Sequence, residues 1–167
     1  IETMENQIIS NQSSTAFSLT GYNNLIVHQI HEVAEWFGFE TRNKYQIMDE
    51  SQRQVAFAVE QQKGVLGFLM RQFLGHWRSF EIFFFNPKQE LVLKAKHPFR
   101  ILFQRLEVSD SQGNFLGALQ QRFSIFSKRF DVQNDNGQII MEVASPIWMI
   151  WTFPFLHAGK KMACVSK

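Results

Sequence analysis

The residues that could do chemistry in this 167-residue chain are few and scattered. Among five histidines, His28 and His31 stand three positions apart, but no third ligand follows in a register that would complete a metal site. The single cysteine, Cys164, rules out an internal disulfide and a cysteine-built zinc centre. The sequence also lacks a nucleophile elbow, a phosphate-binding glycine loop and a paired-carboxylate motif. We therefore expect that the protein is not an enzyme and holds no cofactor.

The run Asn134-Asp135-Asn136-Gly137 gathers several oxygen atoms that could bind calcium. An EF-hand loop, however, needs a spaced acidic series that a glutamate closes twelve positions from its start, and that series is missing. Asn-Gly is a strong hairpin signal. The sequence therefore predicts a turn here rather than a calcium site.

The most unusual segment is the nearly continuous apolar run at 147–156, which holds two Trp, two Phe and one Pro. Trp favours the membrane interface because its ring is apolar while its N–H group prefers water. One interpretation is therefore a shallow membrane anchor. A doubly buried strand followed by a bend is a commoner use of such residues, and a homo-oligomer interface is a third alternative. On the first interpretation, the side chains that contact lipid are Trp148, Met149, Trp151, Phe153 and Phe155.

Basic residues flank this segment and a second apolar stretch at 99–103. Each cation beside an anionic leaflet contributes on the order of 1 kcal/mol, although Lys and Arg at hairpin ends are commonly just solvated charges. With the apolar run they predict a peripheral surface for an anionic phospholipid membrane. The chain carries 17 Lys and Arg against 15 Asp and Glu, and this near-balance argues against a nucleic-acid partner. The predicted basic rim consists of Arg100, Arg105, Lys160 and Lys161.

The elements that must position these residues are hairpins. From Leu25 onward, apolar and polar residues alternate with period two in short runs separated by turns rich in Asp, Asn and Gly, which is the pattern of antiparallel hairpins. Five successive hairpins predict a meandering antiparallel sheet that closes on itself. The predicted turns lie at 49–52, 86–89, 110–113, 134–137 and 157–159.

Three further segments complete the predicted organisation. Residues 64–75 carry apolar residues at helical spacing, so we expect one short helix inserted between strands. Residues 1–20 are polar and aperiodic, which indicates a flexible leader before a domain at 21–167. No stretch reaches the ~18 apolar residues that a membrane-spanning helix needs.

Several motifs resemble the phospholipid scramblase family, within the superfamily of tubby C-terminal-like and LURP-one-related proteins. The stretch Gly38–Ile47 (GFETRNKYQI) is similar to the family signature that leads into the first hairpin. Upstream, Leu25–Ile30 resembles its opening strand. Arg78-Ser79-Phe80, the run Gln89–Leu93 and Ser145-Pro146 follow in the family's order, so the resemblance covers about residues 22–167.

The resemblance implies a closed antiparallel barrel of the tubby C-terminal-like type around a central C-terminal helix, and a role in moving phospholipid between leaflets. This chain stops before the family's last strands, its calcium-associated acidic loop and that helix, so we expect a C-terminally incomplete barrel without dependable calcium binding. The family's two cysteine-rich tracts fall at 99–103 and 147–151, which contain no cysteine here. We expect a peripheral protein at the cytoplasmic face of a membrane or in the cytoplasm. The alternative is a soluble tubby-like module that binds phosphoinositide, nucleic acid or protein.

Overall fold

Eleven antiparallel strands form one sheet in which, among the residues described, each strand pairs only with its neighbours along the chain. The computed structural model describes residues 18–30, 41–61, 79–100, 102–149 and 151–167, and this part of the chain contains no helix. The strands are β1 (Ile26–Ile30), β2 (Thr41–Met48), β3 (Gln54–Gln61), β4 (Phe80–Phe85), β5 (Leu91–His97), β6 (Arg105–Asp110), β7 (Phe115–Arg122), β8 (Ser127–Asn134), β9 (Ile139–Pro146), β10 (Thr152–His157) and β11 (Lys160–Ser166).

Four of the hairpins are joined by the same kind of turn, which begins at an Asp or Asn. In the β6–β7 turn, the N–H group of Asp110 donates to the carbonyl of Asn114 (3.0 Å), and the N–H group of Gly113 donates back to the carbonyl of Asp110 (3.2 Å). The Asp110 side chain also accepts from the N–H groups of Gln112 and Asn114 at 2.9 and 2.8 Å. These bonds hold a three-residue loop of the kind that commonly joins paired strands. The turns that begin at Asp49, Asn86 and Asn134 share this backbone pattern.

The fourth residue of each such turn has a positive φ, as a three-residue hairpin loop requires. Glycine supplies this conformation at Gly113 (φ 91°) and Gly137 (φ 77°), whereas Gln52 and Gln89 adopt it with φ of 59° and 68°. The turn at 134–137 is thus confirmed. All five predicted hairpins are confirmed, because β2–β3, β4–β5, β6–β7, β8–β9 and β10–β11 pair at the predicted turns.

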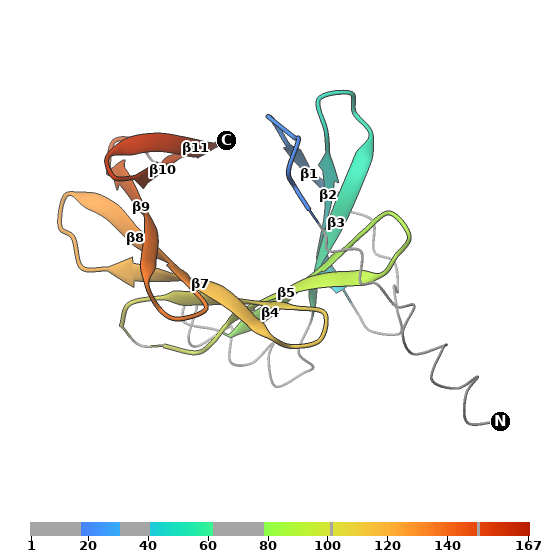
Figure 1. Ribbon diagram of the computed structural model, residues 1–167, viewed down its shortest axis with the longest axis horizontal. Coiled ribbons are helices and arrows are strands. Elements are labelled where there is room, and N and C mark those ends of the chain that lie inside the picture. Colours follow the sequence, from blue (N-terminus) through green and yellow to red (C-terminus); the bar gives the residue numbers. More distant parts are fainter. Residues whose placement is uncertain (1–17, 31–40, 62–78, 101, 150) are drawn as a thin grey trace, which may run out of the picture.

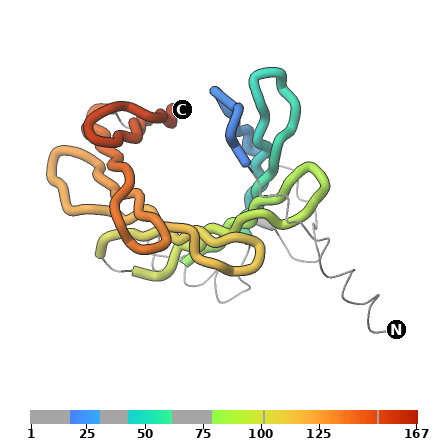
Figure 2. The backbone as a smooth tube through the Cα atoms, in the orientation of Figure 1, coloured from blue at the N-terminus to red at the C-terminus, as the bar shows by residue number. Residues whose placement is uncertain are grey.

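The sheet is open, so the prediction of a closed barrel is wrong. It curves strongly, with β1 to β3 on one side, β8 to β11 on the other and β4 to β7 between them (Figure 1). The backbone path in Figure 2 follows the meander from one edge to the other. Within the part of the chain that the structure describes, β1 at one edge pairs only with β2, and β11 at the other edge only with β10. Hairpin periodicity reports only pairing between neighbours, whereas closure depends on strand tilt and stagger around the whole sheet.

Two other predictions fall largely on undescribed parts of the chain. The predicted helix at 64–75 lies outside the described residues, as does the leader at 1–20 apart from residues 18–20.

The best-buried hydrophobic cluster lies on β3 and β4. Phe57 (2% exposed) is paired in register with Phe85 of β4, and the two rings stack with centroids 5.3 Å apart. Val59 belongs to the same cluster, and Phe83 and Leu91 pack against it. Residues 56–60 of β3 are all buried, so this strand is covered on both faces despite its alternating sequence.

Replacing Phe57 by Ala should lower the free energy of unfolding by about 3–5 kcal/mol, because it removes a buried ring from the stacked pair. The matched control is Phe123→Ala, at a ring that is 75% exposed, which should change stability by about 0.5 kcal/mol or less. Urea unfolding of both variants measures the difference. Equal losses would contradict the placement of the core.

Candidate membrane-contact site

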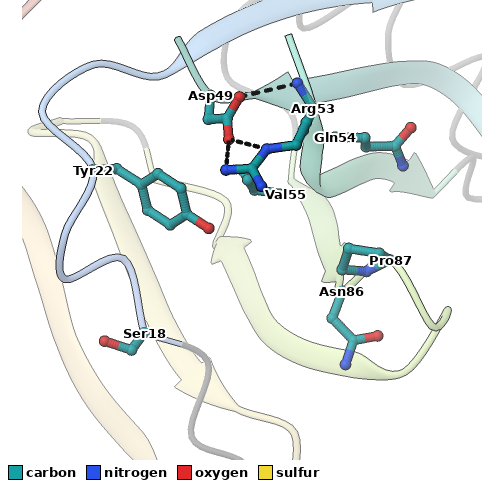
Figure 3. Close-up of a pocket in the computed structure, with 8 residues that line it drawn as sticks. All are labelled: Ser18, Tyr22, Asp49, Arg53, Gln54, Val55, Asn86 and Pro87. Carbon is teal, nitrogen blue, oxygen red and sulfur yellow. Dashed lines mark hydrogen bonds and ion pairs between the residues drawn. The ribbon is translucent and has the colours of Figure 1, made fainter. Parts of the chain in front are cut away.

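A pocket lined mostly by polar residues lies at the end of the sheet that carries the β2–β3, β4–β5, β6–β7, β8–β9 and β10–β11 turns, which we call the turn end. Its volume is about 330 Å³, and the β2–β3 hairpin and the β4–β5 turn supply six of its eight lining residues. Asp49 is the one acid among the lining residues, and it lies beside Arg53 (Figure 3). Its carboxylate accepts from the backbone N–H of Arg53 at 3.0 Å and from the Arg53 guanidinium at 2.9 Å. The lining residues are Ser18, Tyr22, Asp49, Arg53, Gln54, Val55, Asn86 and Pro87.

The Asp49 carboxylate is committed to its own turn. The hydrogen bond from the backbone N–H of Arg53 is the main influence that lowers the pKa of Asp49, and the Arg53 side chain and the N–H of Ser51 act in the same direction. A carboxylate stabilised as the anion in this way is a weak base. We therefore interpret the Asp49–Arg53 pair as a support of the hairpin and not as a catalytic pair.

Because the pKa of Asp49 is lower in the folded chain than in the unfolded one, this carboxylate stabilises the fold above the ordinary Asp pKa of about 3.9. That contribution is lost as the pH falls through the lower, folded value. Asp49→Asn should therefore lower the urea midpoint at pH 7, and the difference from the wild type should shrink in acid.

Glu50→Gln is the matched control, since Glu50 is exposed and its side chain accepts only from the amide of Asn24 among the bonds described. It should leave the midpoint nearly unchanged. An equal effect of the two substitutions would show that Asp49 has no special part in the turn.

The apolar tract lies at the opposite end of the sheet from these turns. Because the strands are antiparallel, the β5–β6, β7–β8 and β9–β10 loops all emerge at this end, which we call the loop end. In the β9–β10 loop, Trp148 is 76% exposed and Trp151 is 56% exposed. Ile147 and Met149 are exposed as well. Residues 147–149 and 151 therefore do not form the buried strand of the alternative interpretation.

The exposed loop has a buried support. Ser145 is fully buried, and its hydroxyl donates to the carbonyl of Met149 at 2.7 Å. The N–H of Met149 donates to the carbonyl of Pro146 at 2.9 Å, and the N–H of Lys167 donates to the carbonyl of Trp151 at 3.1 Å. These three bonds shape the loop that presents Trp148 to solvent.

The other predicted contact residues lie within the sheet. Phe153 and Phe155 are half-buried on β10, so the structure groups Trp148 and Met149 with Trp151 but not with these two rings. Pro154 is tolerated in β10 because the first half of the strand pairs only with β11, and β9 joins it at Phe155.

The four residues of the predicted basic rim do not lie together in the structure. Arg100 is exposed in the β5–β6 loop. Arg105 is half-buried and forms an ion pair with Glu107 at 2.9 Å. Lys160 and Lys161 begin β11 beside the β10–β11 turn, at the far end of a six-residue strand and so about 20 Å from the loop end.

Two other basic residues, Lys167 and Lys128, lie beside aromatic rings at the loop end. The amino group of Lys167 lies 4.9 Å from the centroid of the Trp151 ring, and that of Lys128 lies 5.8 Å from the centroid of Phe153. Both are within the range of cation–π attraction. Sequence reasoning missed Lys128 because this residue lies on a different hairpin from Phe153. Its position at the start of a strand, directly after an apolar loop, could have indicated it.

Among the described residues, neither a metal-binding cluster nor a membrane-spanning helix occurs. No group of three or more His, Cys, Asp or Glu side chains gathers there to hold a metal ion. Nor does any helix able to span a bilayer occur in that part of the chain.

Fold and site thus define a β-sheet domain with an exposed aromatic loop between basic residues. The family model described as Scramblase matches residues 2–167, so the chain belongs to the scramblase family. It is 27% identical over 130 residues to human "Phospholipid scramblase family member 5", covering 73% of this chain and 46% of that protein. It is 28% identical over 136 residues to rat "Phospholipid scramblase 1", covering 77% and 39%.

A yeast protein of a different name is also similar. "Altered inheritance rate of mitochondria protein 25" of Saccharomyces cerevisiae is 24% identical over 168 residues, covering 86% of this chain and 51% of that protein. The chain therefore spans about half or less of the length of these relatives. No solved structure matches it significantly.

Proposed function

We propose that this chain is a phospholipid-binding domain of the scramblase type, which contacts an anionic membrane through the β9–β10 loop and serves the movement of lipid between leaflets. The observation that carries the proposal is the joint exposure of Trp148 and Trp151 in a member of this family. Water-exposed aromatic rings are costly, and full burial of such a side chain stabilises by ~1.5–3 kcal/mol. Insertion into the interface would recover part of that free energy.

The basic residues at the loop end support an anionic surface. A cation near such a leaflet contributes about 1 kcal/mol, and this attraction decays within a Debye length. The amino groups of Lys167 and Lys128 lie close to the rings of Trp151 and Phe153. Each of these rings would therefore reach the interface together with a positive charge. Binding would be peripheral, at the cytoplasmic leaflet where anionic lipid is concentrated.

The proposed function requires no covalent chemistry. Lipid movement needs only a lower barrier for the polar headgroup, and Asp49, the acid that lines the pocket, is held in its own turn. We therefore propose that the protein acts on lipid without an enzymatic step.

Substituting both Trp148 and Trp151 by Ala should weaken binding to anionic vesicles while leaving thermal stability nearly unchanged, because both rings are exposed. Co-sedimentation with phosphatidylserine-containing vesicles at low salt measures the binding, and added salt should weaken that of the wild type. Met162→Ala is the control, since Met162 is 58% exposed on β11 at a distance from the loop. The proposal fails if wild-type protein stays unbound at low salt, or if the Trp substitutions unfold the chain.

Vesicle binding should not require calcium. The Asn134 side chain, which the calcium interpretation would use, accepts from the N–H groups of Asn136 and Gln138 at 3.1 and 2.8 Å. Calorimetry should therefore detect little calcium binding, and Asp135→Ala should not alter it. Micromolar affinity abolished by that substitution would contradict the assignment.

A further inference from the structure

The β7–β8 loop is a second exposed apolar loop at the loop end. Phe123, Ile125 and Phe126 are 75%, 69% and 74% exposed, and only Ser124 stands between them. Single exposed apolar side chains are ordinary, but three in a four-residue loop form a patch. The hydroxyls of Ser124 and Ser127 lie 2.7 Å apart and close the base of this loop.

This loop adjoins the tryptophan loop. The N–H of Ile147 donates to the carbonyl of Phe126 at 3.4 Å, and Ser127 pairs with Pro146 in the β8–β9 register. The two loops therefore lie side by side and present their apolar residues at the same end of the sheet.

The β5–β6 loop lies on the other side of the β7–β8 loop. Leu102 is 72% exposed, and Phe99 and Phe103 are 48% and 45% exposed. This loop is tied to the end of β7, because the N–H of Gln121 donates to the carbonyl of Gln104 at 2.8 Å. Three neighbouring loops thus carry exposed apolar side chains.

The three described loops of the loop end and the last residues of the chain contain basic residues but no acidic ones. Residues 98–104, 121–129, 145–153 and 165–167 include no Asp or Glu. Arg122 is partly neutralised by Asp131 of β8 and Glu142 of β9, whose carboxylate oxygens lie 3.3 and 3.8 Å from its guanidinium. The ion pairs of the described residues include none of the others. The basic residues of these ranges are Arg100, Arg122, Lys128, Arg129 and Lys167.

The opposite end has another character. Its turns are polar and mix both signs of charge, with Asp110 and Asp135 at one part and Lys160 and Lys161 at another. The described part of the sheet therefore has polar turns with both signs of charge at one end, and three apolar loops whose charged residues are all basic at the other.

We infer that the domain docks end-on, with the β5–β6, β7–β8 and β9–β10 loops together entering the surface of an anionic phospholipid bilayer. This inference rests on the proposed function. It adds the orientation of the domain on the membrane and the contacts of the β5–β6 and β7–β8 loops. An anionic lipid surface fits better than a protein partner, because the apolar residues of the three described loops would meet its hydrocarbon and the basic residues of the same loops would meet its charge.

Environment-sensitive fluorophores test the orientation. In a Cys164→Ser background, which removes the exposed native thiol, a nitrobenzoxadiazole probe is attached at Ile125→Cys, at Met149→Cys or, as control, at Gln112→Cys in the β6–β7 turn. Phosphatidylserine-containing vesicles should shift the emission of the first two probes to the blue and leave the control unchanged.

The three probe positions distinguish the end-on orientation from the proposed membrane binding. A response at position 149 alone would overturn the end-on inference and leave the proposed function standing. Silence at both 125 and 149 would defeat both, and a response at 112 would show the wrong orientation.

A triple substitution tests how much the β7–β8 loop contributes to the affinity for vesicles. Phe123→Ser, Ile125→Ser and Phe126→Ser together should weaken binding to these vesicles by at least about tenfold, since three apolar side chains no longer enter the interface. Ile139→Ser with Ile140→Ser is the matched control at the turn end, where both residues are exposed, and it should bind as the wild type does. Loss of a dimer in gel filtration with unchanged vesicle binding would instead make the loops a protein interface and overturn the inference.

Discussion

The fold depends on one repeated interaction, in which an Asp or Asn side chain at the start of a turn accepts the N–H groups that follow it. Asp49, Asp110 and Asn134 each hold two such N–H groups, at positions two and four residues on. These bonds fix the length of the turn and therefore the register of each hairpin, and a slip of one residue would exchange the two faces of a strand. Register in turn decides which loops share an end of the sheet.

The exposed loop end follows from that constraint. The turns that begin at Asp or Asn occupy one end of the sheet, so the apolar loops lie at the other end. There the hydroxyl of the fully buried Ser145 binds the tryptophan loop to the sheet. The core at Phe57 and Phe85 lies on distant strands, so it stabilises the fold without covering these loops. Stability and the proposed membrane contact are thus carried by different residues, which lets each be altered separately.

Local features of the sequence predicted local structure well. The Asp, Asn and Gly signals located five hairpins, because turn chemistry acts within a few residues. Closure of the barrel was predicted wrongly, since it depends on the geometry of all the strands together. Lys160 and Lys161 adjoin the apolar tract in sequence, yet a strand carries them to the other end, whereas Lys128 reaches Phe153 from another hairpin. Proximity in sequence is a poor guide across a β-strand.

We propose that the loop end, and not the turn end, meets an anionic membrane. Hydrogen–deuterium exchange of the whole chain with and without phosphatidylserine-containing vesicles tests it most directly, because it reads both ends in one experiment. We expect slower exchange in peptides that cover 98–104, 121–129 and 145–153, and no change at 86–90, 110–114 and 134–138. Protection confined to those turns, or no protection anywhere while the protein is bound, would contradict the claim.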